Sequence, residues 1–195
     1  MKKLLISVSL AAAAVLPSAA QAQAIPAAVI AVVDLDRVTS DCTACKTATA
    51  ALRSQVQAYQ SRENALAAPL QTEQKSIQAA IDALKGAEPD AALKARVAAF
   101  QTRQQNGAQE LQRQQDQIKR NQQHVQKQIA DKLGPIYSQV MQRRGATIML
   151  EQGATLATAQ SLDVTNDVLA ALNAAMPTIQ TTAPAAPATS TTQGR

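Results

Sequence analysis

The chain has 195 residues, with 19 Lys and Arg against 14 Asp and Glu and a formal net charge of +5. An aromatic content of 2% excludes a globular core of ordinary size, because such cores draw much of their buried area from large aromatic rings. The mildly basic charge permits acidic partners or anionic lipid head groups. It does not by itself indicate a nucleic-acid-binding protein, and we expect no nucleic-acid partner.

Residues 1–22 have the features of an export signal peptide. Lys2 and Lys3 form a basic start, residues 4–16 are an apolar run too short to span a bilayer, and residues 20–22 match a cleavage site. A second match at residues 22–24 leaves the exact position of cleavage open. We therefore expect cleavage near Ala22 and a soluble mature protein in the periplasm.

Residues 23–38 are expected to contain the first strand. The run VIAVV at 29–33 is apolar and rich in β-branched residues, which is typical of a buried strand. Asp34 and Asp36 then end the strand, and we interpret them as strand termination and helix entry rather than as an acid–base pair. A helix is predicted to begin at Thr39 or Ser40, since either side chain can cap it.

Residues 39–144 are predicted to form a long antiparallel helical hairpin. Apolar side chains recur at spacings of three, four or seven from Cys45 to Leu84 and again from Leu93 to Ile136, as in a coiled coil. The breaker cluster GAEPD at 86–90 places the tip of this arm, and its last residue, Asp90, can cap the second helix. An arm of this length reaches roughly 70 Å. Three further features are expected: a kink at 65–69 from Pro69, a break at 134–135, and a glycine cap at Gly145.

Residues 145–176 are predicted to complete the body with a β-hairpin and a last helix. Residues 146–151 and 155–159 are expected to be its two strands, and Asp163 or Thr165 the cap of the helix that Pro177 ends. The rest of the chain, 177–195, is rich in Pro, Ala and Thr and has little to bury, which predicts a disordered tail. The fold class is therefore mainly α with a small β body.

Taken in order, these segments resemble the OmpH/Skp family of periplasmic chaperones. The residues that carry the resemblance are VDLDRV at 33–38, GATIMLEQG at 145–153 and LDVTNDVLAAL at 162–172. The resemblance implies a homotrimer whose strands build a small β-barrel, with helical arms around a cavity for unfolded outer-membrane β-barrel proteins. Trimerisation would also cover strand edges that one chain leaves open. We expect four residues in the trimer body: Ile30, Val32, Ile148 and Leu150.

The two cysteines form a C-x-x-C motif at the predicted start of the arm, which raises three alternatives. A thioredoxin-like redox enzyme needs a packed βαβ scaffold, and the heptads that follow do not supply one. A metal site would need ligands from other chains. We expect a structural disulfide between Cys42 and Cys45, because residues three apart on a helix have α-carbons roughly 5 to 6 Å apart.

No other residue pattern indicates an enzyme or a cofactor. The sequence contains no Gly-rich phosphate loop, so we expect no use of ATP, and His124 lies on a Gln-rich stretch without catalytic neighbours. Seven basic residues are interpreted as a solvated face that could attract acidic client loops, lipopolysaccharide phosphates or an anionic membrane surface. They are Arg113, Lys119, Arg120, Lys127, Lys132, Arg143 and Arg144. The alternative function is a periplasmic coiled-coil scaffold or adaptor that binds a folded envelope complex.

Overall fold

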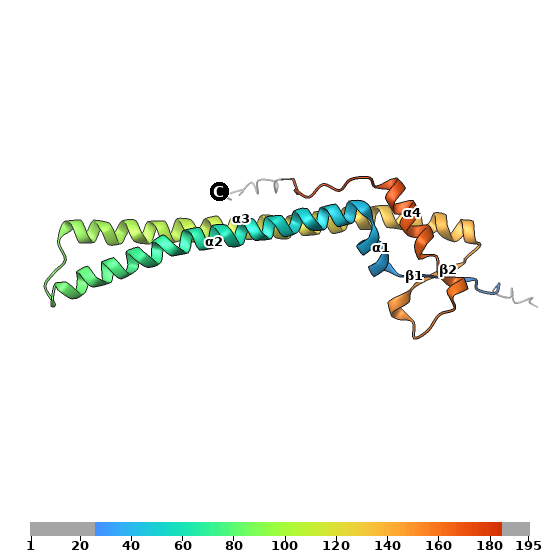
Figure 1. Ribbon diagram of the computed structural model, residues 1–195, viewed down its shortest axis with the longest axis horizontal. Helices are drawn as coiled ribbons and strands as arrows, with labels where there is room; N and C mark the ends of the chain where they lie inside the picture. The colour runs from blue at the N-terminus through green and yellow to red at the C-terminus, as the bar shows by residue number, and fades with distance from the viewer. Residues whose placement is uncertain (1–25, 185–195) are drawn as a thin grey trace, which may run out of the picture.

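Two long antiparallel helices form an arm that projects from a small body at one end of the molecule (Figure 1). This computed structural model describes residues 26–184, so the expected signal peptide at 1–22 lies outside the described residues. Helix α2 (Thr43–Ala83) runs out to the tip and helix α3 (Ala91–Arg144) returns from it. No helix in the described part of the chain is long and apolar enough to cross a membrane.

The ends of α3 are set by local signals. At the tip, the Oδ1 atom of Asp90 accepts a hydrogen bond of 2.7 Å from the backbone N–H of Leu93, which confirms the predicted cap. At the other end, Gly145 has a positive φ of 65° and ends the helix, as predicted, after the basic residues Arg143 and Arg144. The tip turn itself needs positive φ at Lys85 and Gly86.

Pro69 and Pro135 lie inside helices. Helix α2 continues through Pro69, and α3 continues through Pro135 to Arg144, so the prediction of a break at 134–135 was wrong. Leu133, Ile136 and Val140 flank this proline and are buried in the core of the body. The apolar burial of these side chains offsets the backbone hydrogen bond that a proline removes.

A short helix precedes the arm. Helix α1 (Leu35–Asp41) begins earlier than predicted, because the carboxylate of Asp34 caps it by accepting a hydrogen bond of 2.8 Å from the N–H of Arg37. Cys42 then has a non-helical backbone and separates α1 from α2. Thr39 and Ser40, the predicted caps, bond instead to carbonyl groups one turn back within α1.

The sheet differs from the predicted hairpin. Strand β1 (Ile30–Val33) pairs in parallel with strand β2 (Ile148–Glu151), with Ile30 opposite Ile148 and Val32 opposite Leu150. Residues 155–159 are not a strand, and β2 is followed by the 3-10 helices η1 (Gln152–Ala154) and η2 (Gln160–Leu162). Asp163 pairs with the other edge of β1 in an isolated bridge to Val32, and the N–H of Val164 donates to the carbonyl oxygen of Val32 at 2.8 Å.

The core lies where the body meets the base of the arm. Helix α4 (Thr165–Ala175) packs there against α1 and α3. The side chains with no exposed surface include Val38, Val140, Val168 and Leu172, and both cysteines belong to the same cluster. The small area of this core agrees with the low aromatic content of the sequence.

The chain after α4 turns back along the arm (Figure 1). We call residues 177–184 the strap. Ile179 packs against the core, and the backbone of the strap forms hydrogen bonds with side chains of α2 and α3. The structure therefore places this part of the predicted disordered tail against the arm, because Gln and Asn side chains supply partners that composition does not reveal. Residues 185–195 lie outside the described part.

Candidate functional site

One face of the two-stranded sheet is apolar and exposed. Alternation along the strands and the parallel register place the four predicted trimer residues on this face, while Ala31, Val33 and Met149 turn towards the core. Ile30, Ile148 and Leu150 are 39 to 41% exposed, whereas Val32 is buried. We call Ile30, Val32, Ile148 and Leu150 the sheet face. Among the described residues, the outer edge of β2 also has no partner strand.

The motifs that carry the family resemblance meet in the body. The hydroxyl oxygen of Thr165 accepts a hydrogen bond of 2.9 Å from the N–H of Asp34, and Arg37 donates to Asn166 at 2.6 Å. The N–H of Thr43 donates to the side chain of Asn173 at 2.9 Å. These contacts join the start of the arm to α4, so the structure gives Asp34 a capping and packing position rather than a place in a catalytic pair.

Asp163 is held as a carboxylate by the same network. Hydrogen bonds from the hydroxyl and the backbone N–H of Thr165 lower the pKa of Asp163, and the nearby positive charge of Arg37 acts in the same direction. In the first turn of α4, Asp167 forms an ion pair of 2.6 Å with Arg144 at the end of α3. Through the contacts of Asn173 with Thr43 and of Asp167 with Arg144, α4 is bound to both helices of the arm.

The seam of the arm is partly polar. Glu73, which interrupts the predicted apolar pattern, forms ion pairs of 3.3 and 2.6 Å with Arg96 and Arg103 of the facing helix. Halfway along, Arg62 donates to both carboxylate oxygens of Glu110 at 2.6 and 3.0 Å. This bond raises the pKa of Arg62 and lowers that of Glu110. Charge pairs across a water-exposed seam add little stability, so the arm is held together loosely.

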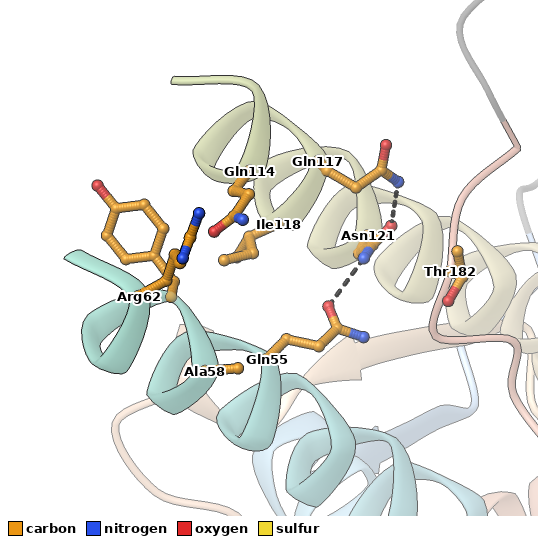
Figure 2. Close-up of a pocket in the computed structure, with 9 residues that line it drawn as sticks. Gln55, Ala58, Arg62, Gln114, Gln117, Ile118, Asn121 and Thr182 are labelled. Carbon is orange, nitrogen blue, oxygen red and sulfur yellow. Dashed lines mark hydrogen bonds between the residues drawn. The ribbon is translucent and has the colours of Figure 1, made fainter. Parts of the chain in front are cut away.

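Nearer the body, the seam contains amide side chains (Figure 2). The side chain of Asn121 is only 4% exposed; it donates to Gln55 at 2.8 Å and accepts from Gln117 at 2.8 Å. Beside these residues lies an open groove of about 420 Å³. Its lining residues are Gln55, Ala58, Tyr59, Arg62, Gln114, Gln117, Ile118, Asn121 and Thr182. Sequence reasoning missed this site, although the polar residue 121 between Ile118 and Val125 of the heptad pattern was a signal for it.

Cys42 and Cys45 form a disulfide in the structure, with α-carbons 5.1 Å apart. The pair lies at the junction of α1 and α2, and both residues are at most 4% exposed. Exchange with another thiol requires access to a sulfur atom, which this burial restricts. Within residues 26–184, no cluster of three or more His, Cys, Asp or Glu residues is arranged to hold a metal ion.

The seven basic residues of the predicted solvated face all lie on α3. In the described part, ion pairs engage two of them, Lys127 with Asp131 and Arg144 with Asp167. Arg120 instead donates to Gln117 next to the amide side chains. His124, the single histidine, is half-buried on the same helix, and its carbonyl oxygen accepts from Gln128. The structure brings none of these residues together into a catalytic arrangement.

Comparisons with known proteins agree with this architecture. A family model described as "Outer membrane protein (OmpH-like)" matches residues 29–172. The crystal structure of a putative outer membrane chaperone (OmpH-like) from Caulobacter crescentus CB15 resembles this chain with a TM-score of 0.65 and 20% identity, over 80% of this chain and 90% of that one. No curated protein sequence matches. The structural likeness at this identity shows a shared fold.

Proposed function

The chain belongs to the OmpH-like outer membrane protein family, and we propose that it is an ATP-independent periplasmic holdase for unfolded outer-membrane β-barrel proteins. The observation that carries this proposal is the shape of the arm. Two helices joined to the body at one end form a long projecting arm (Figure 1), and the groove of about 420 Å³ between them is open to solvent. A weakly apolar, partly polar surface of this kind suits a client without fixed shape.

The proposal includes a homotrimer. The sheet face leaves large apolar side chains in water, and an unpaired strand edge lies beside them. A two-stranded sheet is not stable by itself in water, and pairing with other copies satisfies its edges. Three bodies joined through the sheet face would set three arms around a shared cavity, in which an unfolded chain is kept apart from other unfolded chains.

The test is aggregation of a urea-unfolded outer-membrane β-barrel protein after dilution into buffer, followed by light scattering. We expect the mature protein, at about three chains per client, to suppress scattering in oxidising and in reducing buffer alike. Equal suppression in both buffers is expected because the holdase needs no thiol chemistry. Unchanged scattering in the presence of the folded protein would contradict the holdase and favour a scaffold that binds a folded partner.

A shortened arm gives the matched control. Because Arg62 and Glu110 face each other across the arm, replacing residues 63–109 by a short Gly-Ser loop removes the facing outer parts of both helices and leaves the body intact. This variant should remain folded and trimeric by sedimentation yet suppress scattering less than the full arm, because the cavity between shortened arms is shallower. A shortened variant that suppresses scattering as well as the full arm would place client binding on the body and the retained base of the arm.

A further inference from the structure

The strap is bound to the arm through its main chain. The side-chain amide of Gln128 donates to the carbonyl of Gln180 at 2.8 Å and accepts from its N–H at 3.0 Å. The N–H of Ala183 donates to Asn121 at 2.8 Å, and the carbonyl of Thr181 accepts from Gln55 at 3.1 Å. These four bonds involve only backbone atoms of the strap, so they do not depend on its side chains.

The spacing of the arm amides matches an extended chain. Asn121 and Gln128 are seven residues apart on α3, a rise of about 10.5 Å. Their partners Ala183 and Gln180 are three residues apart, which in an extended chain also spans about 10 Å. The strap therefore runs antiparallel to α3, with one amide contact per heptad. A primary amide is both donor and acceptor, so it can bind any peptide unit that arrives at this spacing.

The same stripe continues beyond the contacts of the strap. Gln114 lies one further heptad before Asn121 and lines the open groove of about 420 Å³. Figure 2 shows Gln114 and Arg62 at one end of this groove and Thr182 of the strap at the other. Asn121 is buried and oriented by Gln55 and Gln117, so its contact atoms are in place before a chain binds.

We propose that Gln114, Asn121 and Gln128 form an amide ladder that binds extended polypeptide backbone, and that the strap occupies Asn121 and Gln128 of this ladder in the absence of client. The inference rests on the proposed holdase function and names a site for it. The strap is attached to the same chain and is thus present at high effective concentration. An unfolded client must displace the strap. The apparent association constant for client is therefore the intrinsic constant multiplied by the fraction of time that the ladder is free.

The strap is suited to displacement. Beyond Ile179, which packs on the core, the described residues are Gln, Thr, Ala and Pro and bury little apolar surface. Hydrogen bonds that water can replace are individually weak. A client segment that brings the same backbone groups together with larger apolar side chains would compete successfully for the ladder.

The first experiment releases the strap without altering the arm. In the mature full chain, Gln180→Pro and Ala183→Pro together remove the two N–H groups that donate to Gln128 and Asn121. We expect this release variant to bind the urea-unfolded β-barrel client about fivefold more tightly, measured by fluorescence titration. Adding Gln128→Ala should cancel the gain, whereas Gln126→Ala, on an exposed part of the same helix, should not.

The second experiment separates client binding from strap binding. Gln114→Ala should weaken client binding about threefold while the amides of Gln180 and Ala183 keep their protection from hydrogen exchange. Gln115→Ala, an exposed neighbour, is the matched control and should change neither. In the unaltered chain, client addition should remove the protection of both strap amides.

The outcomes distinguish this inference from the holdase itself. Suppressed client aggregation, together with an unchanged affinity of the release variant or strap amides that stay protected in the presence of client, would overturn the ladder and leave the holdase in place. A gain in affinity that survives Gln128→Ala would place the client elsewhere on the arm and also overturn it. Failure of every variant to bind client would contradict the holdase.

Discussion

Thr165 shows how one buried side chain joins distant parts of the molecule. It has no exposed surface, accepts a hydrogen bond from the N–H of Asp34 and donates its own N–H to Asp163 at 2.8 Å. Asp34 caps the start of α1 and Thr165 is the first residue of α4, so this hydroxyl connects the first and last helices. A buried N–H without an acceptor is costly, which makes the hydroxyl more important than the volume of the side chain.

Replacing Thr165 with Val should therefore destabilise the body. The isosteric side chain keeps the packing but leaves the N–H of Asp34 without its acceptor, at a cost of about 1 to 3 kcal/mol. Urea unfolding followed by circular dichroism measures the change, and Thr165→Ser, which retains the hydroxyl, should recover most of the lost stability. Equal stability of the Val variant and the parent would contradict this role.

The lowered pKa of Asp163 predicts that the fold loses stability in acid. Hydrogen bonds from Thr165 lower the pKa of Asp163 in the folded state below its ordinary value. A lowered folded pKa means that the carboxylate stabilises the fold above the unfolded pKa, and that this contribution is lost as the pH falls through the folded pKa. Asp163→Asn should reduce the stability difference between about pH 6 and about pH 3 measured by urea unfolding. An unchanged difference would mean that other carboxylates dominate the acid response.

At the scale of elements, the arm depends on signals within a few residues of each helix end. The caps at Asp90 and Gly145, the turn at Gly86 and the heptad pattern together define two antiparallel helices. Pro135 did not break α3, because the side chains around it are buried in the core of the body. Helix α2 also continues through Pro69, which is not among the residues of this core.

Removing the cap at the tip should fray the start of α3. Asp90→Ala removes the acceptor of the N–H of Leu93, and the loss of such a cap costs about 1 kcal/mol. Hydrogen exchange at residues 91–94 should become faster while exchange in the body stays the same, and Asp90→Asn should restore the slow rate. Uniformly faster exchange over the whole chain would show that the cap stabilises more than the tip.

At the scale of the whole molecule, the sheet face is a surface on which a single chain leaves large apolar side chains exposed to water. Ile148 is 41% exposed there, and Ile81 is equally exposed near the tip of the arm. The two residues thus allow the same substitution to be compared at two places with the same accessibility. A charge on the sheet face would be desolvated by trimer formation, whereas a charge at the tip would remain in water.

Ile148→Asp should dissociate the trimer, and Ile81→Asp should leave it intact. Sedimentation velocity measures the assembly, and circular dichroism checks that the helices persist in both variants. Leu150→Asp, on the same face, should act like Ile148→Asp. A helical Ile148→Asp variant that still sediments as a trimer would move the interface away from the sheet face.

The sequence by itself determined the helical arm, its tip at 86–90, the caps at Asp90 and Gly145 and the identity of the family, because periodicity and capping act over a few neighbouring residues. It also predicted the residues of the sheet face, of which Ile30, Ile148 and Leu150 are exposed in the single chain. Their place in a trimer stays a prediction.

Only the tertiary structure decided the parallel pairing of β1 with β2, the bridge between Asp163 and Val32, and the position of the strap on the amide ladder. Each of these features joins residues more than fifty positions apart through backbone hydrogen bonds. Backbone groups are the same at every position, so no residue pattern marks which distant segments will pair. The folded body decides this by setting which segments come within reach of one another.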